Sequence, residues 1–253
     1  MASLRSAYDP RNAELGVFDA LIAARKEYGG SKIALHDADD RKLSYDDIIR
    51  AAFALGSALK KGTKRGEAVG LMLPTGAGAV ITFFALNAYG RVPAMINFTA
   101  GARNVRAALK AAKVKRVATA HAFIEKAELH PLVDELRNDV QFIYLEDVRA
   151  GLGIRDKAAG ALGPVAPWAF AAHPDPKSPA VILFTSATSA RPKGVVLSYR
   201  EHLLNIDPTA DGFGITADDR LYDFRSFNWA LGQPPGALGA IKRAMILSNV
   251  VLP

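Results

Sequence analysis

Cysteine is absent from the 253 residues, and this absence excludes several kinds of site. No disulfide, thiolate nucleophile or cysteine metal site can form, which fits a cytoplasmic protein. The first residues, MASLRSAYDPRNAEL, contain no apolar core and so do not resemble a secretory signal. Half of the residues are hydrophobic and 23% are charged, values typical of a soluble globular chain with one large or two small domains.

A second absence is a continuous apolar run long enough to cross a membrane. Residues 68–98 carry a single charge, at Arg91, but proline and glycine divide them into pieces shorter than the ~20 residues of a spanning helix. The dividing residues are Pro74, Gly76, Gly78, Gly90 and Pro93. We therefore expect this region to fold into buried strands and a helix rather than a membrane span.

Metal and nucleophile motifs are also missing. The five histidines are scattered, without the HxxxH or HExxH spacing of a zinc site, and no G-x-S-x-G elbow supports a Ser-His-Asp triad. Two acidic pairs occur, Asp39-Asp40 and Asp218-Asp219. We interpret them as turn and cap residues rather than as catalytic carboxylates. The sequence therefore assigns no catalytic residue and no metal ligand.

Positive charge is in excess, with a net charge of +7. The basic clusters are Lys60-Lys61, Lys64-Arg65 and the group Lys110, Lys113, Lys115 and Arg116. Such clusters can bind nucleic acid or an anionic membrane surface. They also occur at helix C-termini, where the helix dipole favours cations, and both regions follow helical patterns without interleaved aromatic residues. We favour the second interpretation and expect no nucleic-acid partner, and peripheral membrane contact stays open.

Short apolar runs alternate with segments of helical periodicity. Strands are predicted at 32–36, 41–43, 68–73, 92–96, 115–119, 140–144 and 180–184. Helices are predicted between Ser44 and Gly62 and at 78–89, 102–112 and 121–137. Ser44 with Asp47 and Ser198 with Glu201 have the spacing of capping boxes. Strands separated by helices of this length indicate βαβ units, so the predicted fold is α/β, a mostly parallel sheet with flanking helices.

The composition changes between Gly151 and Pro179, where prolines stand among alanine and glycine. We expect little regular structure there. The predicted organisation is an N-terminal βαβ subdomain at 1–163, a Pro-rich crossing segment at 164–179 and the start of a second subdomain at 180–253. The chain stops on apolar residues after Trp229, so we expect the second subdomain to be truncated.

The most informative stretch is AVILFTSATSARPKGVVLS, residues 180–198. An apolar run leads into a loop of small hydroxylated residues, then Pro-Lys-Gly, then a second apolar run. Phosphate binding needs inward backbone N–H groups and a mobile cation, and here hydroxyl groups and Lys193 add donors. The loop is not a Walker A motif, since no GxxxxGK[ST] is present. The residues alone leave an ordinary surface loop as the alternative.

This loop resembles TSGTTGxPKGV of the adenylate-forming (AMP-binding) enzymes, where the chain reads TSATSARPKGV. Residues 31–98 also resemble the opening of that family, and within it acyl-CoA and acyl-carrier-protein synthetases look most similar. The resemblance implies a ligase that uses ATP and Mg²⁺ to convert a fatty acid or other carboxylate into an acyl-adenylate. Transfer to CoA or an acyl-carrier protein would then give a thioester.

By this resemblance the residues that contact the phosphates of ATP are Thr185, Ser186, Ala187, Thr188, Ser189, Lys193 and Gly194. Gly194 is expected to keep the backbone freedom that the turn needs. Ala187 and Ala190 replace glycines of the family pattern. If either position needs φ > 0, alanine costs about 1–2 kcal/mol, and its methyl group crowds a phosphate oxygen.

The later motifs of the family do not occur in the 253 residues. There is no aromatic-Gly-x-Thr-Glu segment for adenine and Mg²⁺, no Thr-Gly-Asp segment for ribose and no C-terminal catalytic lysine. We therefore expect a fragment of a carboxylate-activating ligase, inactive alone. The alternative is a non-catalytic pseudo-enzyme or remnant that binds only nucleotide phosphates.

Overall fold

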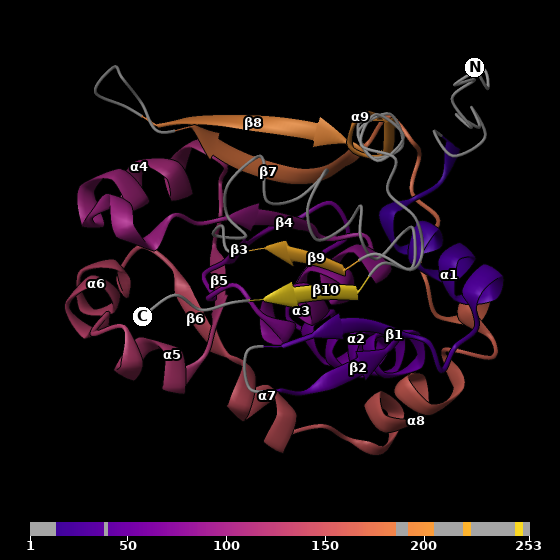
Figure 1. Cartoon of the computed structure of the whole chain (residues 1–253). Helices are drawn as coiled ribbons and strands as arrows, with labels where there is room; N and C mark the ends of the chain where they lie inside the picture. Colours follow the sequence, from indigo (N-terminus) through magenta and orange to yellow (C-terminus); the bar gives the residue numbers. More distant parts are fainter. Residues whose placement is uncertain (1–13, 38–39, 186–191, 205–219, 224–245, 250–253) are drawn as a thin grey trace, which may run out of the picture.

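The computed structural model describes residues 14–37, 40–185, 192–204, 220–223 and 246–249, and within them two β-sheets (Figure 1). The larger sheet has the strand order β6-β5-β3-β4-β7-β8. Its parallel strands are β3 (Ala68–Leu71), β4 (Val92–Met95), β5 (Arg116–Thr119), β6 (Gln141–Tyr144) and β7 (Pro179–Thr185). The edge strand β8 (Lys193–Ser198) is antiparallel to β7. The predicted fold class, a mostly parallel sheet with flanking helices, is confirmed.

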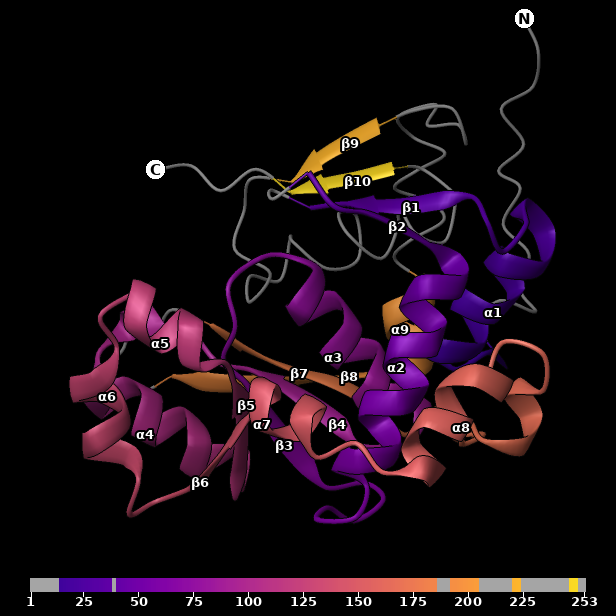
Figure 2. The ribbon, with the colours of Figure 1, turned by 90° about the horizontal axis from the view of Figure 1, so that it is seen from below.

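The smaller sheet has the order β2-β1-β10-β9. It joins the predicted hairpin of β1 (Ile33–His36) and β2 (Lys42–Ser44) to β10 (Ile246–Asn249) and β9 (Arg220–Asp223). Helices α2 (Tyr45–Leu59) and α3 (Ala77–Ala88) lie between the two sheets, as Figure 2 shows. Helix α1 (Val17–Tyr28) packs beside them.

The other face of the larger sheet is covered by α4 (Ala102–Ala111), α5 (His121–Lys126) and α6 (His130–Leu136). The side chains of β7 divide between the two layers: Val181 and Leu183 join the core around α1–α3, whereas Ile182 joins the core beneath α4–α6. This alternation follows from the two-residue period of a strand. Because both faces are covered, the strands read as continuous apolar runs, which is why the sequence located them.

Two predicted capping boxes are confirmed. The Ser44 hydroxyl accepts from the Asp47 backbone N–H, and the Asp47 carboxylate accepts from the Ser44 backbone N–H at 2.9 Å, at the start of α2. Ser198 and Glu201 make the same reciprocal bonds before α9 (Tyr199–Leu204). Each box satisfies backbone donors that the first helical turn leaves free.

Two predictions of secondary structure are wrong. The single helix predicted at 121–137 is split into α5 and α6, where Glu128 has a φ of 52° and Pro131 stands in the first turn of α6. Residues 151–179, expected to lack regular structure, contain α8 (Ile154–Leu162) and the 3₁₀ turn η3 (Pro167–Ala169). Helices α1 and α7 (Leu145–Ala150) were not predicted at all.

Helix α8 forms because its small residues allow it to pack closely against α2. A Cβ placed at Gly160 would lie 2.9 Å from the backbone oxygen of Arg50. A Cβ at Gly163 would lie 2.0 Å from the ring of Phe53, which is fully buried. Glycines that look like helix breakers in the sequence are therefore contact residues in the structure.

A buried carboxylate also joins α8 to α2. Asp156 accepts hydrogen bonds from the Ser57 hydroxyl at 2.8 Å, from Lys61 Nζ at 2.6 Å and from the Gly153 backbone N–H at 3.0 Å. Burial raises the pKa of Asp156, but these hydrogen bonds and the Lys61 charge lower it by more. The net shift of the pKa is therefore downward. The ionised form is stabilised because each of its oxygens has a donor.

The six-stranded sheet continues across the predicted subdomain boundary, because β7 pairs with β4. The division at residues 163 and 179 stays a prediction. In the part of the chain that the structure describes, no helix has the length and apolar character needed to span a membrane.

His202, on α9, is a buried titratable group. Neither of its ring nitrogens has a hydrogen-bond partner among the described residues, and its ring centroid lies 6.2 Å from that of Phe83. Burial lowers the pKa of His202 to about 4. The neutral imidazole is therefore part of the folded core, and its protonation opposes folding.

We expect Gly163→Ala to lower the free energy of unfolding by about 1–3 kcal/mol, because the added methyl group overlaps the Phe53 ring. Gly62→Ala is the matched control, since a Cβ at Gly62 meets no atom within 4 Å. Urea denaturation of both variants measures the difference. Equal stabilities would contradict the close α2–α8 packing.

We also expect stability to fall on acidification between pH 6.5 and 4. The unfolded chain binds a proton at His202 near pH 6.5, whereas the folded chain binds it only near pH 4, so the full stability is present above pH 6.5. The loss across this window is about 3 kcal/mol. Urea titrations of His202→Leu should show a smaller loss, whereas His130→Gln, at a 63% exposed side chain, should behave as the wild type. An unchanged pH slope in His202→Leu would contradict this assignment.

Candidate phosphate-binding site

The hydroxyl-rich loop connects β7 to β8, and the structure fixes both ends of it. In the antiparallel pairing, Thr185 stands opposite Lys193 and Phe184 stands opposite Gly194. Directly opposed residues in an antiparallel pair place their side chains on the same face of the sheet. The Thr185 hydroxyl and the Lys193 ammonium therefore share one face at the base of the loop.

That base lies at the carboxyl edge of the larger sheet. Strands β3 to β7 are parallel, so their carboxyl ends meet at one edge, and the chain enters the loop directly after Thr185. Open α/β sheets bind ligands in the crevice outside these ends. Leu183 packs with α1–α3 and Phe184 with the opposite core, so the alternation places Thr185 on the α1–α3 side.

The structure places only part of the predicted site. Thr185, Lys193 and Gly194 are described, whereas Ser186, Ala187, Thr188 and Ser189 lie outside the described residues, as does Ala190. The backbone angles at Ala187 and Ala190 therefore stay a matter of prediction. Asp39 and the pair at 218–219 also lie outside the described part of the chain.

Lys193 has the properties of a cation that is available to a ligand. It is exposed, and within the described residues no carboxylate pairs with it. Gly194 lies inside β8, is absent from the described residues with positive φ, and a Cβ there would meet Ile182 and Phe184 at an ordinary 3.5 Å. The backbone freedom expected at Gly194 is therefore not used in this conformation.

Sequence reasoning did not single out a second group of polar side chains at the same edge. The His121 and Tyr144 rings, which follow β5 and end β6, stack with centroids 3.8 Å apart. His121 Nε2 lies 3.1 Å from an Asp147 carboxylate oxygen. Glu146 accepts the backbone N–H groups of His121 and Ala122; burial raises its pKa, but these bonds lower it more. His121, Glu146 and Asp147 stand just after parallel strands in the sequence, and this position was the signal that could have placed them at the carboxyl edge.

No group of three or more metal-ligating side chains occurs within the described residues. The described part of the site therefore offers the Thr185 hydroxyl and the Lys193 ammonium, which suit phosphate oxygens. It offers no carboxylate set for Mg²⁺.

Known proteins with similar sequences include delta-poly-L-ornithine synthetase of Acinetobacter baumannii. It is 24% identical over 222 residues, which is 87% of this chain and 15% of that protein. The chain thus spans a small part of this relative.

Two solved structures share the fold. VinN in complex with 3-methylaspartate superposes with a TM-score of 0.78 at 22% identity, covering 93% of this chain and 62% of that chain. The second is the o-succinylbenzoate CoA synthetase MenE of Bacillus subtilis in complex with the acyl-adenylate intermediate OSB-AMP. It superposes with a TM-score of 0.71 at 17% identity, covering 91% of this chain and 55% of that chain.

The family model for AMP-binding enzymes matches residues 22–246, which include the loop and both of the strands that hold it. With the strand–loop–strand geometry and the shared fold, this match confirms the resemblance that the loop suggested. The chain belongs to the family of AMP-binding, adenylate-forming enzymes.

Proposed function

We propose that this chain forms the ATP-phosphate-binding part of a carboxylate-activating ligase. The observation that carries the proposal is Lys193, exposed and free of described carboxylates, opposite Thr185 at the carboxyl end of β7. The residues of the loop that complete this cradle, Ser186, Ala187, Thr188 and Ser189, are proposed ligands by family membership, and Gly194 is proposed with them.

In the proposed reaction, a carboxylate oxygen of the substrate attacks the α-phosphorus of ATP. The bond from the α-phosphorus to the oxygen that bridges the α- and β-phosphates breaks, so pyrophosphate leaves with that oxygen and an acyl-adenylate forms. A thiol sulfur of CoA or a carrier protein then attacks the acyl carbon, AMP leaves and the thiol proton passes to solvent. Lys193 and the loop hydroxyls hold the outer phosphates and orient them for departure. Bound Mg²⁺ would neutralise charge on the phosphates.

We propose an amino-acid-type carboxylate as the acyl substrate, in place of the fatty acid that the sequence resemblance favoured. The support is that the ornithine synthetase and the VinN complex are both named for amino acids. Calorimetric titration of the purified chain with aspartate, ornithine and a fatty acid, each in turn, tests the choice. Binding of the fatty acid alone would contradict it.

A non-catalytic role is the second candidate, and alanine at positions 187 and 190 favours it. Both proposals expect the 253-residue chain to lack catalysis by itself, since the adenine, ribose and lysine motifs of the family do not occur in it. They differ in how well the loop grips phosphate once its glycines are restored.

We expect the purified chain to bind ATP weakly and to show ATP–pyrophosphate exchange no higher than background. Lys193→Ala should weaken ATP binding about tenfold, because a charge-assisted hydrogen bond is lost. Lys177→Ala is the control, an exposed lysine just before β7 at the opposite edge of the sheet. Isothermal titration calorimetry measures both. Exchange well above background would contradict the expected inactivity, and an unchanged Lys193→Ala affinity would remove Lys193 from the site.

We expect the double variant Ala187→Gly, Ala190→Gly to bind ATP at least about tenfold more tightly, since an alanine that must adopt positive φ costs about 1–2 kcal/mol. The same titration measures this gain. No gain would show that the two alanines do not limit phosphate binding, and a remnant that never needed those glycines would then be the better description.

A further inference from the structure

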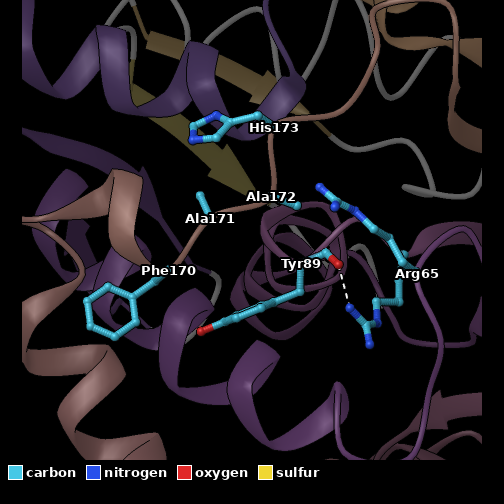
Figure 3. Close-up of a pocket in the computed structure, with 7 residues that line it drawn as sticks. Arg65, Tyr89, Phe170, Ala171, Ala172 and His173 are labelled. Carbon is cyan, nitrogen blue, oxygen red and sulfur yellow. Dashed lines mark hydrogen bonds between the residues drawn. The ribbon is translucent and has the colours of Figure 1, made fainter.

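A pocket lies at the amino edge of the larger sheet, opposite the edge that carries the loop (Figure 3). Its volume is about 490 Å³. Three chain segments form its wall: Arg65 before β3, Tyr89 and Arg91 before β4, and residues 170–173 before β7. Pockets of this size accommodate small molecules. Because these segments all precede their strands, the pocket is separate from the loop that follows β7.

Arg91 provides a fixed positive charge in the pocket wall. Its Nε donates to the Thr63 hydroxyl at 2.9 Å, its Nη1 donates to the Tyr89 carbonyl, and its Nη2 donates to the carbonyls of Lys60 and Thr63. These bonds hold the guanidinium in place with neutral acceptors, so its charge is not cancelled by a direct carboxylate contact.

Arg65 provides a second guanidinium, on an exposed residue. Its side chain crosses Gly90, where φ is +71° and a Cβ would lie 3.1 Å from Arg65 Cγ and Nε. Among the described residues Arg65 makes no hydrogen bond or ion pair. Burial lowers the pKa of Arg91, and the negative charge of Glu67 raises it. The positive charge of Arg65 lowers the pKa of Arg91 as well, because the two guanidinium charges repel one another, and the net shift is downward.

The nearby carboxylates are already occupied. Glu67 pairs with Arg116 at 2.5 Å and accepts the Lys64 backbone N–H at 2.8 Å. Asp19 accepts the Gly16 backbone N–H at 3.1 Å and lies 3.9 Å from His173 Nδ1. The pocket therefore presents two guanidinium groups, and neither has a direct carboxylate contact among the described residues.

The rest of the pocket wall combines aromatic and small apolar side chains with the exposed imidazole of His173. Figure 3 shows the Tyr89 and Phe170 rings on one side, with Arg65 reaching in from the other side toward Ala172. Tyr89 is held in position by its hydroxyl, which donates to the Phe53 carbonyl at 3.2 Å, and Phe170 packs on the Phe53 ring at 5.8 Å. A ligand that fills this space carries an apolar or aromatic part beside its charged group.

We propose that this pocket binds a phosphate monoester of a small apolar or aromatic group. A monoester carries a charge of about −1.5 to −2 at pH 7, which matches two guanidinium groups better than a singly charged carboxylate does. Arg65 donates to two phosphate oxygens in the forked geometry of its guanidinium, Arg91 supplies fixed charge, and Phe170 contacts the apolar part. This binding is independent of the proposed adenylation site.

Phenyl phosphate is the probe, titrated into the purified chain by calorimetry at low salt. We expect Arg65→Gln to weaken binding at least about tenfold, the loss of one charged bidentate contact. Lys64→Gln should change it less than about twofold, because Lys64 adjoins Arg65 and is exposed but does not line the pocket. Benzoate should bind about tenfold more weakly than phenyl phosphate, since it carries one charge. Lys193→Ala should leave binding unchanged.

Four results would contradict this proposal in whole or in part. Equal losses in Arg65→Gln and Lys64→Gln would reduce the effect to general attraction by a basic surface. Equal affinity for benzoate would overturn the choice of phosphate, and loss of binding in Lys193→Ala would locate the ligand at the β7–β8 loop. No heat of binding at about 10 mM phenyl phosphate would overturn the pocket as a site. Circular dichroism of each variant establishes that it is folded.

Discussion

The burial of β7 is the constraint on which the proposed chemistry depends. This strand pairs with β4 on one side and β8 on the other, and its side chains enter two separate apolar cores, with Val181 and Leu183 in one and Ile182 in the other. A strand held in this way cannot slip by one residue without moving its whole apolar set to the wrong face. Thr185 and Lys193 therefore stay fixed at the carboxyl edge, where a charge that must meet the phosphates of ATP needs a rigid base.

The parallel sheet also gives its two edges different roles. The helices that connect its strands run back from the carboxyl edge, so their C-termini and the cations that complement them gather at the amino edge. Lys110 in the last turn of α4 and Lys60 after α2 illustrate this arrangement. Most of this charge balances helix dipoles or local carboxylates. Arg65 has no carboxylate partner among the described residues, since Glu67 pairs with Arg116 and Asp19 lies beside His173, and we propose that it serves a ligand in the pocket at this edge.

Local sequence patterns predicted much of the larger sheet and the start of α2. Apolar runs located the strands of the larger sheet, and the spacing of Ser44 to Asp47 located the start of α2. Helix α8 was missed because its stability comes from distant partners, such as Asp156 with Ser57 and Gly163 with Phe53, which no local pattern contains. The two proposed sites differ in the same way in how well the sequence predicts them. Lys193 belongs to a continuous motif, whereas the Arg65 pocket combines three segments that only the folded sheet brings together.

The central claim is that Lys193 holds the outer phosphates of ATP. Phosphorus NMR of ATP during titration with the chain tests this most directly, because it reports each phosphate separately. The account predicts that the β- and γ-phosphorus signals shift more than the α-signal, and that Lys193→Ala removes this difference. Shifts confined to the α-signal, or β and γ shifts that persist in Lys193→Ala, would contradict it.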